Sequence, residues 1–220
     1  MSHLDNEIHL LKEQLIEMHQ MVRSQLSKCK SALMTYDIGL ARDVLANEKR
    51  INAFELKIDR DCENILALFN PVAIDLRFVL AALKINTNLE RMGDYAEGIA
   101  RYILDVKGPF SEKLLSDYKV EEMYFIAVSM MDDALDALIK EDTSIARKVF
   151  IKDATLDQMN TSATQTTLRC IAENSEDSLH YLNMLSIIRK MERVGDQTKN
   201  VAEEIIFFIE AKVLKHGAQK

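Results

Sequence analysis

Residues 83–103 read LKINTNLERMGDYAEGIARYI, and residues 185–205 read LSIIRKMERVGDQTKNVAEEI. The two stretches align without a gap at a shift of 102 positions. Each contains the pattern Glu-Arg-x-Gly-Asp, at Glu90–Asp94 and at Glu192–Asp196, and apolar residues stand at matching positions around it. Self-similarity at a fixed period is the signature of one supersecondary unit that is used repeatedly. The chain therefore contains an internal duplication.

Apolar residues in and before the first copy recur at alternating steps of four and three. They are Phe78, Ala82, Ile85, Leu89, Met92, Ala96, Ile99 and Ile103. This seven-residue period predicts a helix that packs along its whole length in a bundle. Similar stripes run from Leu4 to Leu33 and from Val44 to Phe69. Asp37 is placed to cap the second of these helices, and Asn70-Pro71 to end it, so three helices are predicted for the first half.

The breaker pair Gly108-Pro109 lies close to the midpoint of the chain and predicts the boundary between the halves. Beyond it, the apolar periodicity predicts three more helices. They run from about Asp117 to Glu141, from about Ser144 to Glu173 and from about Glu176 to Lys212. We therefore expect an all-α fold in which six long antiparallel helices form two tandem three-helix bundles, residues 1–107 and residues 110–220.

Composition and charge exclude several classes of protein. The 220 residues include only six glycines and two prolines, too few for the many turns of a sheet protein. The net charge of −7 argues against nucleic-acid binding, because such proteins neutralise phosphates with a basic face. The longest apolar runs, such as Ile205–Ile209, are far shorter than the roughly 20 residues that span a bilayer. We expect neither nucleic-acid binding nor membrane insertion.

The cysteines and the first residues bear on location. Cys29, Cys62 and Cys170 form no Cys-x-x-Cys pair, which is typical of small core residues in a reducing compartment. The opening MSHLDNEIHLL lacks the basic and apolar regions of a secretion signal. Both observations predict a cytoplasmic protein.

Each repeat holds two carboxylates one turn apart on a helix face, Glu90 with Asp94 and Glu192 with Asp196. At about 100° per residue these side chains point away from the apolar stripe, so we expect them outside the core. The preceding helix of each half carries a polar stripe of its own. The stripes comprise Glu48, Asn52, Glu55 and Asp59 in the first half, and Asp153 and Asp157 in the second.

Antiparallel helices bring residues equidistant from their turn to the same level. A turn near Pro71 places Glu90 and Asp94 beside Glu48 and Asn52, and a turn near Ser175 does the same for the second set. Each half is thus predicted to gather oxygen ligands from two helices, with no His or Cys among them. Such ligands suit Mg²⁺, Ca²⁺, Mn²⁺ or iron, and Zn²⁺ less well.

A solvated acidic face is the alternative interpretation of such side chains. Two features of the repeat favour a site. Like charges one turn apart destabilise a helix by a few tenths of a kcal/mol, yet the spacing recurs in both halves. Each copy also contains a glycine, Gly93 or Gly195, which costs about 1 kcal/mol relative to alanine inside a helix. Close helix packing, or space for a bulky ligand, would explain these glycines.

The paired stretches Leu89–Asp94 and Met191–Asp196 resemble the two Glu-Arg-x-Gly-Asp signatures of the PhoU family. The resemblance covers nearly the whole chain. It includes the stripe from Glu48 to Asp59, the sequence Asn70-Pro71 followed by Asp75-Leu76-Arg77, and the closing Asn200–Ile205. One signature would be weak evidence for the family, but two signatures in register with duplicated helices are strong evidence.

The resemblance implies a cytoplasmic regulator of phosphate uptake that restrains the phosphate-starvation response, the Pho regulon. It would communicate between the ATPase subunit of a phosphate ABC transporter and a sensor histidine kinase, without catalysis of its own and often as a homodimer. Some members carry iron or zinc sites on the bundle surface. The corresponding positions are Glu90, Asp94, Glu192, Asp196, Asp153 and Asp157. Asn52 stands where a first-half ligand could be an acid, and Glu55 or Asp59 could substitute for it.

Two other classes remain open from the sequence. A di-iron carboxylate enzyme needs inward-facing Glu and two Glu-x-x-His motifs, but of the five histidines only His180 follows an acid by three positions. Gly-rich phosphate loops and nucleophile elbows are also missing from the sequence. No organic cofactor and no enzymatic activity are therefore expected. A helical adaptor, whose carboxylates only keep it in solution, is the second alternative, and metal content would separate it from the regulator.

Overall fold

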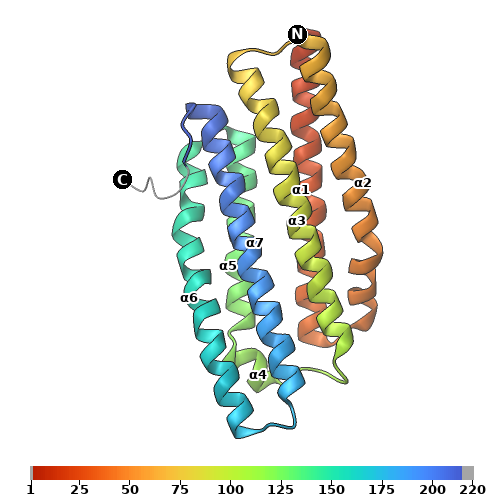
Figure 1. Ribbon diagram of the computed structural model, residues 1–220, viewed down its shortest axis with the longest axis vertical. Helices are drawn as coiled ribbons and strands as arrows, with labels where there is room; N and C mark the ends of the chain where they lie inside the picture. The colour runs from red at the N-terminus through yellow and green to blue at the C-terminus, as the bar shows by residue number, and fades with distance from the viewer. Residues whose placement is uncertain (1, 215–220) are drawn as a thin grey trace.

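The computed structural model describes residues 2–214 and places two three-helix bundles side by side (Figure 1). The first bundle comprises α1 (His3–Thr35), α2 (Ile38–Phe69) and α3 (Ala73–Asp105). The second comprises α5 (Val120–Lys140), α6 (Thr143–Glu173) and α7 (Ser178–Glu210). A short helix, α4 (Glu112–Asp117), lies in the connection between them. The predicted all-α fold of paired three-helix bundles is confirmed.

Capping residues explain why the helices of the first bundle begin and end where they do. Ser2 and Asp5 form a capping box at the start of α1, which satisfies two backbone N–H groups that the helix leaves unpaired. The side chain of Asp37 accepts a hydrogen bond from the backbone N–H of Leu40, as expected for the predicted N-cap of α2. Asn70 ends α2 in the left-handed conformation, just before Pro71.

The structure corrects two predicted helix boundaries and adds one element. Ser111 caps α4, which contains Asp117, and Lys119 then adopts a left-handed conformation with φ of 49°. This break moves the start of the fourth long helix from about Asp117 to Val120. Ala211 is left-handed as well, so α7 ends at Glu210 instead of Lys212. The division into residues 1–107 and 110–220 stays a prediction, and its outer ends, residue 1 and residues 215–220, lie outside the described chain.

The core follows the predicted stripes. Every apolar residue of the seven-residue period in α3 is buried, from Phe78 to Ile103. All three cysteines are buried and unpaired, in agreement with the expected role as small core residues. Within residues 2–214, no helix combines the length and apolar character needed to cross a membrane.

Two antiparallel helices, α3 and α7, form the main interface between the bundles. The Lys84 ammonium lies 3.0 Å from both carboxylate oxygens of Glu204, and Arg77 Nε donates a hydrogen bond of 3.1 Å to the carbonyl of Phe208 at the end of α7. α1 also contacts α5, where Arg23 forms two hydrogen bonds with the carboxylate of Asp132. The two repeats therefore form one continuous structure, with the Glu-Arg-x-Gly-Asp helices at its centre (Figure 1).

Candidate metal centre

The first cluster consists of Glu48 on α2 and of Glu90 and Asp94 on α3. One carboxylate oxygen from each of the three lies within 4.8 Å of the other two. The predicted antiparallel turn near Pro71 therefore does bring these acids to one level. Glu48 is buried, Glu90 is half-buried and Asp94 is exposed, so the cluster opens from the α2–α3 groove toward solvent.

Asn52 contributes to the first cluster through its contact with Glu48. Its Nδ2 donates a hydrogen bond of 2.9 Å to Glu48 Oε2. The other oxygens of both side chains, Glu48 Oε1 and Asn52 Oδ1, are buried and have no hydrogen-bond partner among the described residues. A buried oxygen without a donor costs on the order of 1–3 kcal/mol, and more when it is charged. A cation bound here would supply what these two oxygens lack.

The remaining members of the α2 stripe play other roles. Asp59 accepts a hydrogen bond of 2.9 Å from Nδ2 of the buried Asn86, and the same Nδ2 donates to the backbone oxygen of Glu55. Neither Glu55 nor Asp59 belongs to the close group of three. Asp59 therefore anchors α3 to α2, while the half-buried Glu55 adds negative charge near Glu90.

The second cluster consists of Asp153 and Asp157 on α6 and of Asp196 on α7, again with oxygens within 4.8 Å of one another. Asp153 is the buried member, at 3% exposure. Glu192, which corresponds to Glu90, does not belong to this close group. Its carboxylate takes a hydrogen bond from Asn160.

Lys199 is the residue of the second cluster that the sequence reading missed. Its Nζ lies 2.7 Å from Asp153 Oδ2. The signal was present in the repeat, because Lys199 follows Asp196 by three positions and therefore shares its helix face. The position that corresponds to Lys199 in the first half is Glu97.

Expected and observed burial differ at two positions. Asp94 and Asp157 are exposed as predicted, but Glu48 and Asp153 are buried at 9% and 3% exposure, so the expectation of outward-facing stripes is wrong for them. The reason is helical spacing. Glu48 lies four residues after Val44 and three before Ile51, and Asp153 lies likewise between Val149 and Leu156, so each occupies a core position of its own helix.

Burial, and then nearby negative charges, raise the pKa values of all three carboxyl groups of the first cluster. Burial, followed by the charges of Asp94, Glu55 and Glu48, raises the pKa of Glu90 from its ordinary value of 4.5 to about 7. The pKa of Glu48 is also raised, mainly by burial and then by Asp94 and Glu97. The pKa of Asp94 is raised by burial and by Glu97. Among the described residues, no lysine or arginine forms an ion pair with Glu48, Glu90 or Asp94. The charges of Arg91 near Glu90 and of Lys190 near Asp94 oppose these shifts only in part, so negative charge is concentrated here without an ion-paired cation.

The second cluster has a different charge balance. Burial and Asp153 raise the pKa of Asp196, while Lys199 opposes the shift. The hydrogen bond with Asp153 in turn raises the pKa of Lys199. The side chain of Lys199 is 36% exposed and that of Asp153 only 5%, so the ammonium covers the buried carboxylate from the solvent side.

The repeated glycines serve helix packing. A Cβ on Gly93 would lie 3.2 Å from two atoms of Ile51, and a Cβ on Gly195 would lie 2.5 Å from Leu156 Cδ1. Ile51 and Leu156 occupy corresponding positions of α2 and α6, 105 residues apart. Of the two explanations that the sequence left open, the contacts support close packing of the helix that carries the other ligands. The glycines thereby bring the two ligand-bearing helices of each half together.

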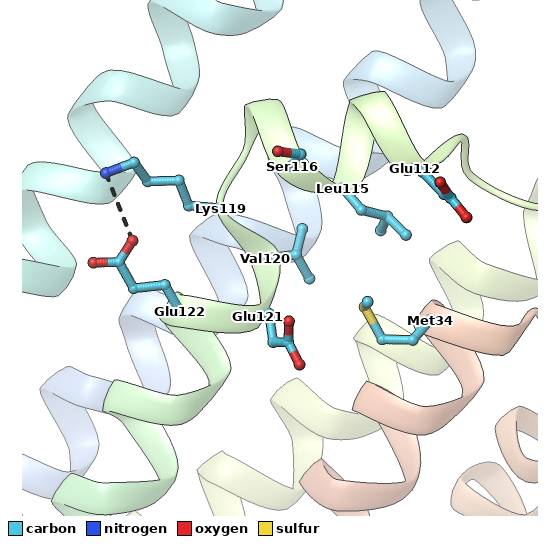
Figure 2. A pocket seen from close by; sticks show the side chains of 8 residues that line it. All are labelled: Met34, Glu112, Leu115, Ser116, Lys119, Val120, Glu121 and Glu122. Carbon is cyan, nitrogen blue, oxygen red and sulfur yellow. Dashed lines mark ion pairs between the residues drawn. The ribbon is translucent and has the colours of Figure 1, made fainter.

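A separate cavity of about 540 Å³ lies where the end of α1 meets α4 and the start of α5 (Figure 2). Met34, Leu115 and Val120 give it an apolar floor, and glutamates surround it. Lys119 reaches Glu122 across 3.6 Å beside this cavity. None of the predicted ligands lines it, so it is not part of either cluster.

Known proteins match this chain in both bundles. The model of the PhoU domain family matches residues 15–103 and 120–205, one match in each bundle. A protein of Aquifex aeolicus, described as a phosphate-specific transport system accessory protein PhoU homolog, is 33% identical across 97% of this chain and 96% of its own length. The corresponding accessory protein of Escherichia coli K12 is 30% identical across 96% of this chain and 86% of its own.

Solved structures that resemble this chain belong to the same family as the relatives found by sequence. The crystal structure of PhoU from Pseudomonas aeruginosa superposes with a TM-score of 0.88 at 28% identity, covering 96% of this chain and all of the other. The phosphate transport system regulatory protein PhoU from Streptococcus pneumoniae gives a TM-score of 0.85 at 27% identity, covering 97% of this chain and all of the other. The match extends through both bundles and over nearly the full length of each relative. The chain belongs to the PhoU family.

Proposed function

We propose that this chain is an accessory regulator of phosphate transport that binds an oxygen-ligated metal ion at its first cluster. The observation that carries the regulatory role is the family match in both bundles. The relatives are named as accessory or regulatory proteins of phosphate transport systems, and they match over nearly the whole chain. The finer role that we propose is the one the family resemblance implies. The chain restrains the phosphate-starvation response by communicating between a phosphate ABC transporter and a sensor histidine kinase.

The proposal places the protein at the cytoplasmic face of the transporter, as a homodimer. It includes no catalytic step. The acidic clusters support cation binding, because each brings three carboxylates within 4.8 Å of one another. In this view, signalling depends on contacts between proteins.

The metal component of the proposal depends on the donor set. Glu48, Glu90 and Asp94 supply three carboxylates, and Glu48 Oε1 and Asn52 Oδ1 are oxygens that lack a hydrogen-bond partner. Hard cations such as Mg²⁺, Mn²⁺ or Ca²⁺, and also iron, take such oxygen ligands. A bound cation would neutralise the charges that raise the pKa of Glu90 and would link α2 to α3. Zn²⁺ fits this set less well, because histidine and cysteine are absent from it.

The regulatory role can be tested in a host strain that lacks its own copy of the gene. A reporter of the phosphate-starvation response should be active at high phosphate in that strain and repressed again when the chain is supplied. Phosphate uptake should be measured in the same cultures. A reporter that stays active with the supplied chain, present at normal levels, would contradict the regulatory proposal.

The metal component has a separate test. The untagged protein is purified without added metal, beside a variant with Glu90, Asp94, Glu192 and Asp196 changed to alanine, and both are subjected to elemental analysis. Metal in the parent and its loss from a folded variant would support the proposal. Equal, near-zero metal in both, with no binding on titration, would favour the alternative of a helical adaptor without metal.

A further inference from the structure

The second cluster has Asp157 at the position that corresponds to Asn52, and the two clusters also differ in charge sign at a further pair of corresponding positions. Position 97 in α3 and position 199 in α7 each follow the aspartate of the repeat by three residues. The first is a glutamate and the second is a lysine. Because residues three apart share a helix face, each of these side chains lies beside its own cluster.

In the second cluster, Lys199 already provides a cation. Its Nζ lies 2.7 Å from Asp153 Oδ2, a distance typical of a charge-assisted hydrogen bond. Asp153 is the buried member of the cluster, so its ion pair with Lys199 is less screened by solvent than a surface pair. The ammonium holds Asp153 Oδ2 and brings one positive charge to a group of three carboxylates.

The first cluster has no such group. Glu97 adds negative charge near Asp94 and Glu48. Lys190 of the second bundle lowers the pKa of Asp94 through its charge, but it forms no ion pair there, and its Nζ lies over the rings of Tyr95 and Tyr102 at 5.6 and 5.9 Å from their centroids. The buried oxygens of Glu48 and Asn52 also lack partners. Glu97 itself pairs with Arg101 across 2.6 Å, so the first cluster offers its three carboxylates without a cation of the described residues bound to any of them.

We propose that Lys199 is a tethered counter-ion that closes the second cluster, so that divalent cations load the first cluster first. The inference rests on the metal component of the proposed function and adds an order of loading to it. A metal ion can enter the second cluster only when the Lys199 side chain swings away from Asp153. The exposure of that side chain, 36%, leaves it a path into solvent. Because entry requires the loss of a charge-assisted hydrogen bond, we expect the second cluster to bind at least about tenfold more weakly than the first.

The test is Mn²⁺ binding to the full chain, measured by calorimetry and by electron paramagnetic resonance of free Mn²⁺ after treatment with a chelator. The wild type should show one class of tight sites. A Glu90→Gln/Asp94→Asn variant should lose it, and an Asp196→Asn variant should keep it. Lys199→Gln, which retains a hydrogen-bond donor without the charge, should add a second class of sites whose affinity approaches that of the first.

Two matched variants sharpen the result. Glu97→Lys places a lysine at the corresponding position of the first cluster and should weaken its Mn²⁺ affinity about tenfold or more. Lys190→Met removes a lysine that lies on aromatic rings and should leave the number of sites unchanged. Circular dichroism verifies that each variant is folded, and if Lys199→Gln does not fold, Glu97→Lys tests the same principle from the other half.

Several results would overturn the inference. If the wild type loads both clusters with equal affinity, or if Lys199→Gln adds no site, Lys199 does not control loading, although metal binding itself stands. If the tight site survives Glu90→Gln/Asp94→Asn but is lost with Asp196→Asn, the order of loading is reversed. If neither the wild type nor any variant binds Mn²⁺, both the inference and the metal component of the proposed function are wrong.

Discussion

The two bundles are built on the same repeat, yet their acidic clusters have different charge balances. In the first, Glu48, Glu90 and Asp94 face one another with no described cation among them, and Glu97 adds further negative charge. In the second, Lys199 forms an ion pair with the buried Asp153. Both halves have the same helix arrangement, but the charged side chains beside the two clusters differ.

The two halves share the same packing contact between their ligand-bearing helices. Gly93 receives Ile51 from the neighbouring helix, and Gly195 receives Leu156 in the same way. A change at such a contact affects the separation of two long helices, whereas a change of charge at a half-exposed position leaves the backbone in place. The repeat therefore shows that the fold requires the glycine contact between the helices, whereas the charges beside it can differ and set the properties of each cluster.

The largest expected difference between the halves is their response to metal. At a Mn²⁺ concentration of about 100 times Kd, binding at the first cluster should raise the free energy of unfolding by about 2.7 kcal/mol. The Glu90→Gln/Asp94→Asn variant should lose this increment, and the matched Glu192→Gln/Asp196→Asn variant should keep it. Urea denaturation with and without Mn²⁺ gives the comparison. Equal losses in the two variants would mean that the clusters are equivalent.

A somewhat smaller effect is expected when the internal cation is removed. Lys199→Met leaves the buried Asp153 without its partner, and we expect the metal-free protein to lose about 2 kcal/mol of unfolding free energy, below the range for fully buried pairs because Lys199 is partly exposed. Lys190→Met is the control and should cost about 0.5 kcal/mol, since it removes contacts with aromatic rings and a charge near Asp94 but no ion pair. Equal costs for the two substitutions would show that the Lys199 ion pair is unimportant.

The glycines provide a third contrast. Gly195→Ala places a methyl group 2.5 Å from Leu156, and Gly93→Ala places one 3.2 Å from Ile51. Overpacking costs about 1–3 kcal/mol, while alanine recovers about 1 kcal/mol of helix propensity. Gly195→Ala should therefore destabilise by about 1–2 kcal/mol and Gly93→Ala by less than about 0.5 kcal/mol, as measured by chemical denaturation. A larger loss at Gly93 would contradict this ranking.

The smallest expected effect is on the pH dependence of the metal-free protein. The pKa of Glu90 is about 7 in the folded state against an ordinary value of 4.5. Between these values the folded protein holds a proton that the unfolded chain has released, so the free energy of unfolding falls as pH rises through this range. Allowing for solvent screening at a half-exposed group, we expect a loss of about 1 kcal/mol from pH 5 to pH 8.

Glu90→Gln should flatten that dependence and stabilise the protein at pH 8. The corresponding Glu192→Gln should change it less, because Asn160 donates a hydrogen bond to Glu192 and opposes its pKa shift. Denaturation curves at several pH values, with a chelator present, measure both variants. A profile unaltered by Glu90→Gln would show that this carboxyl group titrates normally.

The acidic ligands were predictable only in part. The repeat and an antiparallel turn sufficed to place Glu48 with Glu90 and Asp94, and Asp153 with Asp196. They did not reveal that Glu48 and Asp153 are buried, because charge predicts a surface position while helical spacing places both acids among core residues. They also did not separate Glu192 from its cluster, since side-chain distances across two helices decide which carboxylates meet.

The sequence by itself determined how many long helices form, roughly where they lie, and that they are duplicated. Apolar periodicity and capping are local properties that each helix carries in its own residues. The roles of Lys199, Asn86 and the glycines were decided only by the tertiary structure. Each depends on which side chain of a neighbouring helix lies within a few ångströms, and two helices must pack before that distance exists. The duplicated sequence thus specifies one fold twice and supplies a lysine at only one of the two corresponding positions, while packing decides that this lysine meets the buried Asp153.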